Sequence, residues 1–415
     1  MSTRGDHLVR GGLLFVNGSG VLGRLFSKSF AVVLDQIEER LEVGGLDVIL
    51  PDGQGRRLGF KKPGPEAIVR LHSWYALVRL VTSGSIGWYR AWTSGEWSSP
   101  DPVPIFALFT ANARSLGDTG RAKGVARLFN LIKHNRRDND LLTARENIRA
   151  HYDLGNDFYS AWLDTTMTYS SARFVSSNDT LEEGQLHKIQ ALLNRLDLKT
   201  GQRMLEIGCG WGSLAIEAAK RGAQVVALTL SSEQKAWAEL KIAAAGLSDR
   251  IEIRLQDYRD TDDQFDAIAS VEMVEAVGQR WWPAYVDCVS RNLMPSGRAA
   301  LQFISIDHEI FDGYVRNPDF IQAYIFPGGC LLDEGRFSTL ADERGLSWEK
   351  RDGFRLDYAE TLKRWRVRYD EAVARGALDG FGDDFHNLWR YYLMYCEGGF
   401  RGGAIDVAQV TLVKA

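Results

Sequence analysis

The chain has 415 residues, of which 45% are hydrophobic and 25% charged, and its formal net charge is −4. This length allows two or three domains, the composition is that of an ordinary globular protein, and the charge gives no global attraction to nucleic acid. No apolar run approaches the roughly 18–20 residues of a membrane span, and Leu13–Val16 is too short for a secretory signal. The four cysteines are scattered and the seven histidines show no ligand spacing, which predicts a cytoplasmic protein with reduced thiols and no metal site.

Residues 1–115 predict a small α+β domain. The stretch LEVGGLDVILPDGQGRRLGF indicates two strands around a turn at Asp52-Gly53. The following PEAIVRLHSWYALVRLVTSG predicts a helix from Pro65 to Gly84. A group of tryptophans favours core packing, with an apolar platform for lipid or another subunit as the alternative. These are Trp74, Trp88, Trp92 and Trp97.

Residues 116–145 form a predicted basic, amphipathic linker. Positive side chains surround an apolar stripe between residues 121 and 137, as in a helix that lies on a membrane surface or in a solvated connector. Both interpretations stay open at this point. The basic residues are Arg121, Lys123, Arg127, Lys133, Arg136 and Arg137, and the stripe is Val125, Leu128, Leu131 and Ile132.

Residues 146–415 alternate between strand-like and helix-like segments, with helices expected at 213–221 and 232–246. This alternation predicts an α/β fold with a parallel, doubly wound sheet and ligands at the carboxyl ends of its strands. The expected strands are 203–207, 224–229, 251–255, 265–271, 298–304 and 407–413.

The stretch MLEIGCGWGSLAIEAAKRG places Gly208, Gly210 and Gly212 between a strand and a helix, where backbone can approach a ligand closely. A dinucleotide site is one interpretation, but no acidic residue ends the second strand in VVALTLSSEQ. A tight turn without a ligand is another. The pattern Glu206-x-Gly-x-Gly-x-Gly resembles S-adenosylmethionine-dependent methyltransferases instead, with Glu206 favouring the positive end of the cofactor.

Two further segments fit such a cofactor site. Gln256 and Asp257 end the third strand with groups suited to an adenine edge, and the strand at 265–271 runs into Glu272 and Glu275 near the cofactor methyl group. For each carboxylate the alternative is a solvated position at a helix start. The strand end opens on the predicted cleft, which favours a functional role for Glu275.

Beyond the glycine turn, several segments between 146 and 415 resemble the cyclopropane-fatty-acid synthase family. They are HYDLGNDFYSAWLDTTMTYSSARF, TLSSEQ, YIFPGG, DYAETLKRW and WRYYLMYCEGGFRGGAIDVAQV, in this order. The region before 146 is only weakly similar, in type, to the N-terminal domain of the longer members. The resemblance implies a class I (Rossmann-like) methyltransferase domain at 146–415.

The resemblance also implies the cofactor and the reaction. The enzyme would transfer a methyl group from S-adenosylmethionine to the cis double bond of an unsaturated acyl chain in a membrane phospholipid, through a carbocation that aromatic rings stabilise. The implied cofactor-binding residues are Tyr169, Ser170, Glu206, Gly208, Gly210, Trp211, Gly212, Thr229, Leu230, Gln234, Gln256 and Asp257.

The family often holds bicarbonate as the general base, using a Cys, a Glu, a His and a Tyr. Glu275 and Tyr358 match two of these, whereas Ser171 stands at the Cys position and Gln302 at the His position. A hydroxyl and an amide can still hydrogen-bond an anion, so bicarbonate stays possible. Cys396 matches a cysteine once favoured as nucleophile, although carbocation chemistry needs no thiol.

The two departures favour a methylene-branched product, which a separate reductase converts to 10-methyl chains, over ring closure to a cyclopropane. Glu146 is a candidate protein carboxylate in place of the ion, the alternative being a surface or helix-start residue. Two different functions stay open, namely methylation of a small polar acceptor and a non-catalytic, lipid-binding role in a reductase complex. The expected location is cytoplasmic and peripheral at the inner face of the membrane, with a reductase subunit or a second copy of the chain as possible protein partner.

Overall fold

The computed structural model describes residues 4–13, 30–117 and 154–415. Their contacts divide the chain into two compact units, each built from segments distant in sequence. The first takes its residues from Met1–Asp138, Asp307–Pro327 and Asp379–Ile405, and the second from Asn139–Ile306, Gly328–Leu378 and Asp406–Ala415. The predicted basic helix at 121–137 and Glu146 lie outside the described residues, so the linker and its boundaries stay predictions.

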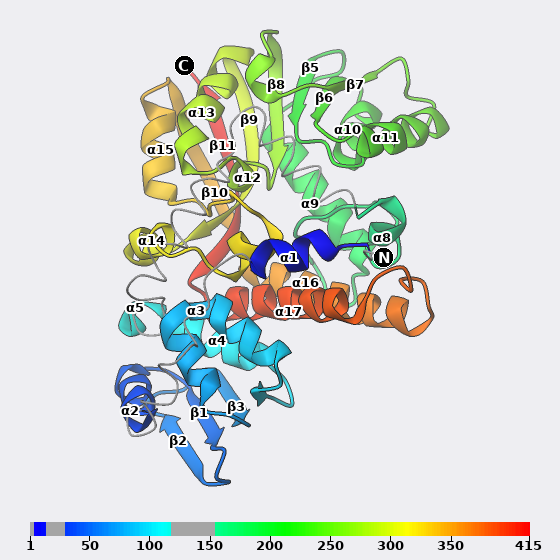
Figure 1. Ribbon diagram of the computed structural model, residues 1–415. Helices are drawn as coiled ribbons and strands as arrows, with labels where there is room; N and C mark the ends of the chain where they lie inside the picture. The colour runs from blue at the N-terminus through cyan, green and yellow to red at the C-terminus, as the bar shows by residue number, and fades with distance from the viewer. Residues whose placement is uncertain (1–3, 14–29, 118–153) are drawn as a thin grey trace. The chain divides into compact units, whose positions relative to one another are not determined.

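The first unit contains a four-stranded sheet of order β2-β1-β3-β4. β1 and β2 are antiparallel, and Gly53 in the turn between them has φ 86°, which confirms the predicted hairpin. The elements of this unit, labelled in Figure 1, are α1 (Asp6–Leu13), α2 (Phe30–Arg40), β1 (Gly45–Ile49), β2 (Gly55–Gly59), β3 (Glu66–Leu71), α3 (Tyr75–Thr93), β4 (Trp97–Ser98), α4 (Val103–Ala111), α5 (Ala113–Leu116), α14 (His308–Val315), the π-helix η4 (Ile321–Ile325) and α17 (Asp383–Gly402).

The predicted helix from Pro65 to Gly84 is wrong in its first part. Glu66–Leu71 forms β3, in which exposed and buried residues alternate strictly, as half-buried strands require. The helix α3 starts only at Tyr75 and continues past Gly84, where the backbone is non-helical (φ 57°, ψ −140°). Gly84 therefore kinks α3 and does not end it.

Aromatic packing joins the distant segments of the first unit. The ring of Tyr89 on α3 lies 4.9 Å from Phe320, 4.8 Å from Tyr324 and 4.9 Å from Tyr391 on α17. Helices α4 and α17 also approach closely, because a Cβ on Gly398 would lie 2.4 Å from the Cβ of Phe106. These apolar contacts explain why 307–327 and 379–405 belong with the N-terminal segment. Trp88 and Trp97 stack at 4.4 Å and are buried, as core packing predicts.

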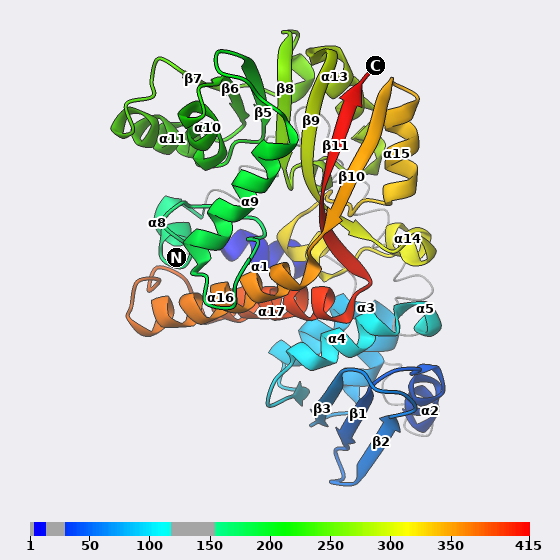
Figure 2. The ribbon, with the colours of Figure 1, turned by 180° about the vertical axis from the view of Figure 1, so that it is seen from behind.

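The second unit contains a seven-stranded sheet of order β10-β11-β9-β8-β5-β6-β7 (Figure 1). Figure 2 shows β10 and β11 side by side at one edge. The elements are α8 (Asn156–Ser160), α9 (Leu181–Arg195), β5 (Arg203–Ile207), α10 (Ser213–Lys220), β6 (Gln224–Thr229), α11 (Ser232–Ala244), β7 (Ile251–Leu255), η2 (Tyr258–Asp260), β8 (Phe265–Val271), α12 (Val274–Val277), η3 (Gln279–Trp281), α13 (Trp282–Asn292), β9 (Leu293–Ile306), α15 (Glu334–Asp342), β10 (Leu346–Gly353), α16 (Arg355–Ala374) and β11 (Ile405–Lys414).

The six predicted strands and both predicted helices of this unit are confirmed, and β9, β8, β5, β6 and β7 are parallel. β10 was not predicted, because its sequence LSWEKRDG shows little alternation and few of its residues are buried. It forms by antiparallel pairing with β11, a contact that local sequence does not reveal.

Both faces of the central strands are buried. Met204, Val225 and Ala267 pack with residues of α9, α10 and α11 in one apolar cluster. Their neighbours Leu205 and Val226 point to the opposite face and are buried as well. A sheet buried on both faces is the doubly wound arrangement that the sequence predicts, and it leaves the strand ends as the place for a ligand. Among the described helices of both units, none is long and apolar enough to cross a bilayer.

Helix α9 begins with a capping box, which gives a first testable expectation. The Oγ1 of Thr180 accepts a hydrogen bond from the N–H of Glu183 at 3.2 Å, and the Glu183 carboxylate accepts one from the N–H of Thr180 at 2.7 Å. Thr180→Ala is expected to lower the free energy of unfolding by about 1 kcal/mol, measured by urea denaturation. In the background of Glu183→Ala the same change should cost clearly less, and equal costs in both backgrounds would contradict a shared cap.

Candidate active site

The glycine turn lies directly after β5, and its three glycines have positive φ values of 84°, 51° and 89°. A Cβ on Gly208 would lie 2.8 Å from the Cγ of Met273, and one on Gly212 would lie 3.0 Å from the Cβ of Ala238. Gly210 differs, because a Cβ there would meet no atom of the described residues within 4 Å. Packing therefore explains glycine at 208 and 212, whereas the turn beside Gly210 faces open space that a ligand can use.

Two buried polar atoms beside this turn have no hydrogen-bond partner among residues 4–13, 30–117 and 154–415, namely Oε2 of Glu206 and Nε2 of Gln234. Burial raises the pKa of Glu206 to about 8, although the nearby Lys188 ammonium lowers it. S-adenosylmethionine carries an ammonium group and ribose hydroxyls, which can donate to such an acceptor and accept from such a donor. The residues present therefore fit this cofactor, and its contacts with Glu206 and Gln234 stay a prediction.

The end of β6 supports the position of Gln234. Its Oε1 accepts a hydrogen bond from Thr229 Oγ1 at 2.9 Å, and its backbone N–H is capped by Ser231 at 3.2 Å. Because the oxygen is used in this way, the amide Nε2 is the group of Gln234 that can donate to a ligand. Leu230, between the two strand-end hydroxyl residues, is partly buried.

Helix α9 holds the predicted cofactor segment at Tyr169 and Ser170. Lys188 Nζ donates to Ser170 Oγ at 2.6 Å, and Gln185 Nε2 donates to the Ser170 carbonyl at 2.9 Å. Burial lowers the pKa of Lys188 to about 8, against the nearby Glu272, Asp164 and Glu206 carboxylates, which raise it. Sequence reasoning missed Lys188 and Gln185. The available signal was two polar residues on the same helical stripe as Leu181 and Leu192.

Aromatic rings surround the same segment. The ring of Tyr159 lies 5.5 Å from that of Tyr169 and 5.1 Å from that of Trp211, whose Nε1 donates to Asn156 Oδ1 at 2.7 Å. Tyr159 and Trp211 are buried, whereas Tyr169 is partly exposed. This wall brings three rings from separate segments to one side of the glycine turn.

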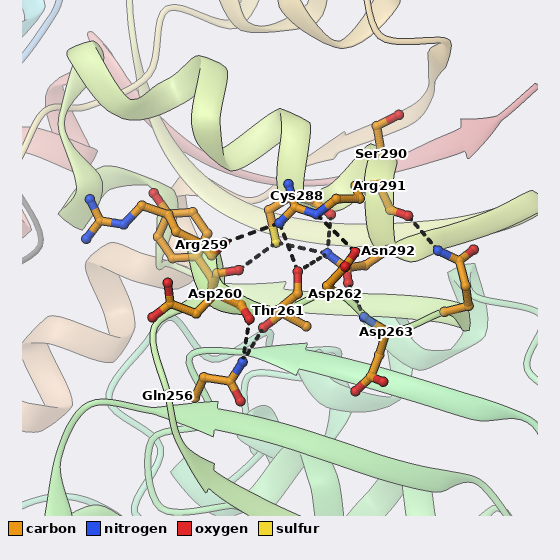
Figure 3. Close-up of polar contacts among 12 residues, drawn as sticks. Gln256, Arg259, Asp260, Thr261, Asp262, Asp263, Cys288, Ser290, Arg291 and Asn292 are labelled. Atoms are coloured by element: carbon orange, nitrogen blue, oxygen red, sulfur yellow. Dashed lines mark hydrogen bonds and ion pairs between the residues drawn. The ribbon is translucent and has the colours of Figure 1, made fainter.

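Gln256 and Asp257 make local contacts at the end of β7. Gln256 Nε2 donates to the Asp260 carbonyl at 3.0 Å, and the Asp257 carboxylate pairs with Arg259 at 2.8 Å. Figure 3 shows the loop tied to α13, where Asn292 Oδ1 accepts from the N–H of Asp263 at 2.9 Å. The loop is thus fixed in place by its own side chains, and an adenine contact by Gln256 or Asp257 stays a prediction.

Three of the four residues predicted to hold an anion, Ser171, Gln302 and Tyr358, converge on a protein carboxylate. Glu272 Oε1 accepts hydrogen bonds from the N–H of Ser171 at 2.9 Å and from Gln302 Nε2 at 2.8 Å. Glu272 Oε2 accepts one from the Tyr358 hydroxyl at 2.6 Å. Burial raises the pKa of Glu272, while these donors and Lys188 lower it. Its signal in the sequence was its place at the end of the β8 strand.

Ser171 contributes differently from the prediction. Its hydroxyl donates to the Ala172 carbonyl at 2.8 Å, so its backbone N–H, and not its side chain, reaches the carboxylate. The expectation of a hydroxyl at the anion position is therefore wrong in this structure. The hydroxyl hydrogen is used by the neighbouring peptide carbonyl.

The amide of Gln302 is oriented by a chain of hydrogen bonds. Arg195 Nε donates to Gln409 Oε1 at 3.3 Å, and Gln409 Nε2 then donates to Gln302 Oε1 at 3.1 Å. Because its oxygen is used in this way, Gln302 presents its Nε2 to Glu272. Gln409 was not predicted, although a glutamine within the buried run of β11 is an available signal.

Glu275 lies near this cluster but makes separate contacts. Its Oε1 accepts from the N–H of Ile304, and its buried Oε2 has no partner in the described part of the chain. Burial and, to a lesser extent, the neighbouring Glu272 carboxylate raise the pKa of Glu275 to about 8. The structure thus brings Ser171, Glu275, Gln302 and Tyr358 into one unit.

Cys396 lies on α17 in the other unit, and burial raises the pKa of its thiol. A buried thiol that resists ionisation is a poor nucleophile. Glu146 falls in the part of the chain that the structure leaves undescribed, so its role as base stays a prediction.

Comparisons with known proteins agree with this geometry. The family described as mycolic acid cyclopropane synthetase matches residues 139–410. A tuberculostearic acid methyltransferase of Mycobacterium tuberculosis is 37% identical over 84% of this chain and 82% of its own length. A cyclopropane-fatty-acyl-phospholipid synthase of Escherichia coli is 36% identical over 81% of this chain and 85% of its own.

The solved structures include a mycolic acid cyclopropane synthase, CmaA1, complexed with SAH and CTAB. It covers 65% of this chain and 98% of its own, with 31% identity and a TM-score of 0.61. The cofactor turn, the doubly wound sheet and these matches lead to one assignment. The chain belongs to the mycolic acid cyclopropane synthetase family and is an S-adenosylmethionine-dependent fatty acid methyltransferase with the class I fold.

Proposed function

We propose that the enzyme methylates the cis double bond of an unsaturated acyl chain in a phospholipid and releases a methylene-branched chain. The observation that carries the proposal is the cluster around Glu272. Groups at the positions of the implied bicarbonate ligands, Ser171, Gln302 and Tyr358, all donate to a protein carboxylate. A proton acceptor held in a different position favours loss of the methyl proton after a hydride shift, which gives the methylene product. The similarity to a tuberculostearic acid methyltransferase supports the same product.

When bound, S-adenosylmethionine supplies the electrophilic methyl group. Glu206, Gln234 and the open side of the turn at Gly210 would hold it. An alkene is a weak nucleophile, so the two reactants must be aligned in a dry site. The rings of Tyr159, Tyr169 and Trp211 supply apolar walls and faces that stabilise nearby positive charge.

Ring closure to a cyclopropane is the second candidate. The similarity to a cyclopropane-fatty-acyl-phospholipid synthase of Escherichia coli favours it. Both products pass through the same methylated cation, and they differ in whether hydride migrates before the proton leaves. The position of the base relative to the cation therefore decides between them.

Mass spectrometry of fatty acids tests the product. A host that expresses this chain without any accessory reductase is fed methyl-labelled methionine. We expect a labelled chain that is heavier by one CH2 group. Ozone should cleave its double bond and leave a ketone on the branched carbon. A labelled chain that resists ozone would identify a cyclopropane and overturn the methylene proposal, and the absence of label would overturn both candidates. A matched strain carrying Gly210→Ala controls for the methylation capacity of the host.

A membrane surface and a reductase are part of the same proposal. Substrate in a bilayer requires a peripheral contact, for which the basic residues between 121 and 137 stay the candidate segment. A methylene product calls for a separate enzyme that reduces it. A cytoplasmic location at the inner face of the membrane accords with both.

A further inference from the structure

We propose that Glu272 is the general base of this enzyme and takes the place of an external bicarbonate ion. The inference rests on the proposed methylation of an alkene, and it names the group that ends that reaction. It assigns a catalytic role to a residue that the family resemblance does not supply.

Glu272 lies beside the glycine turn that begins at Gly208. Ile207 of β5 is in register with Ser270 of β8, so Gly208 and Glu272 follow directly at the ends of adjacent parallel strands. The residue after Glu272, Met273, is the one that a Cβ on Gly208 would strike. Carboxyl ends of neighbouring strands are where this fold binds its reactants.

The backbone of Glu272 is also unusual. Its φ of 48° lies in the left-handed region, which a non-glycine residue seldom adopts. Residues held in such conformations concentrate at active sites, where surrounding contacts maintain them. Here the N–H of Glu272 donates to the Gln302 carbonyl at 2.7 Å, which fixes the strand end in this conformation.

The hydrogen bonds to Glu272 leave its Oε2 able to accept a proton. A carboxylate has about four lone-pair sites. Oε1 accepts from both Ser171 N and Gln302 Nε2, whereas the one donor to Oε2 among the described residues is the Tyr358 hydroxyl. Oε2 therefore keeps a lone pair, and the donors hold the carboxylate in a fixed orientation for the transfer.

The same arrangement disfavours bicarbonate. Gln302 and Tyr358, two donors that the resemblance assigns to an anion, are already used by Glu272, and a second anion beside this carboxylate would be repelled. The amide of Gln302 cannot change its charge with pH, so it acts as a permanent donor. Burial also raises the pKa of Glu272, which strengthens it as a proton acceptor.

Transfer of the methyl group leaves a carbocation that a base must neutralise. The alkene electron pair forms the new carbon–carbon bond to the methyl group, while the sulfur keeps the electrons of the bond that breaks. After a hydride shift, Glu272 Oε2 takes one proton from the new methyl group. The electrons of that C–H bond become the second bond of the exocyclic alkene. Glu272 is left as a neutral acid and returns the proton to solvent in the next cycle.

Glu272→Gln tests the base directly. The amide keeps the size of the side chain but cannot take up the proton, so turnover should fall at least about a hundredfold. Binding of S-adenosylmethionine, measured by calorimetry, should stay within a few-fold of the parent. Glu343→Gln, an exposed substitution on the same unit, is the control and should retain turnover. Turnover by Glu272→Gln near the parent level would overturn the proposal.

Glu272→Gly adds an independent readout. Glycine relieves the positive φ and vacates the position of the carboxylate, so the donors Gln302 and Tyr358 become available to an added anion. We expect ¹³C-bicarbonate to bind this variant but not the parent, as seen by NMR on the cofactor-free proteins. Bicarbonate should also restore part of its turnover, while the parent should be active in bicarbonate-free buffer. Loss of parental activity on bicarbonate removal, or bicarbonate binding by the parent, would overturn the proposal.

Failure of the proposed function can be distinguished from failure of the role proposed for Glu272. If the parent enzyme methylates no alkene, the product analysis shows this before any variant is compared. A cyclopropane product with a bicarbonate-independent parent would leave Glu272 as the base and would refute only the methylene product.

Discussion

Replacing Gly210 with alanine is expected to weaken S-adenosylmethionine binding by roughly tenfold to a hundredfold, or about 1–3 kcal/mol. Within 4 Å the Cβ meets no atom of the described residues, so it would project into the space that we assign to the cofactor. The positive φ of 51° adds a cost of about 1 kcal/mol to folding. Calorimetric titration with the cofactor measures the first effect, and urea unfolding measures the second.

Gly246 provides a matched control for this substitution. It also has a positive φ, 69°, and a Cβ there would likewise meet nothing within 4 Å. It lies after α11, away from the glycine turn. Gly246→Ala should therefore cost similar folding stability and leave cofactor affinity unchanged. Equal affinities for the two variants would show that the space beside Gly210 is not the cofactor site.

Glu275→Gln is expected to remove a large part of the pH dependence of stability. Burial raises the pKa of Glu275 from 4.5 to about 8, so between these values the folded state holds a proton that the unfolded state has lost. The folded state binds more protons, and the free energy of unfolding therefore falls as the pH rises. Glu275 alone lowers the free energy of unfolding by up to about 1.4 kcal/mol for each unit of rising pH.

Urea unfolding of the cofactor-free protein at several pH values between about 5 and 8 measures this slope. Glutamine mimics the protonated acid, so the variant should match the parent near the lower limit and exceed its stability near the upper one. Glu206, whose pKa burial also raises to about 8, leaves a residual slope in both proteins. Parallel curves for parent and Glu275→Gln would contradict a protonated Glu275 in the folded state.

The cofactor half of the site was accessible from the sequence because its signals are local. A strand that ends in a glycine turn and leads into a helix is one continuous segment, from Arg203 to Lys220, and its period and glycine spacing show the structure directly. The same holds for the strands that flank it. β10 was missed because its pairing with β11 joins residues far apart in the chain.

The acid–base half of the site was accessible only in part. Ser171, Gln302 and Tyr358 were named from the resemblance, and Glu272 was noted only as a strand-end carboxylate. Their convergence joins residues 101, 30 and 86 positions away from Glu272. Neither spacing nor composition predicts contacts of that kind, because they depend on how the strands and α16 pack.

The sequence by itself determined the fold class, the cofactor turn and the family, since these depend on short-range periodicity and on contiguous motifs. The tertiary structure decided the composition of the two units, the start of α3 and the role of Glu272. Packing of rings such as Tyr89 and Tyr391 assigns distant segments to one unit. Hydrogen-bond donors gathered from three separate segments likewise determine which carboxylate holds the central position. Both results are set by the free energy of long-range contacts, which a linear pattern does not encode.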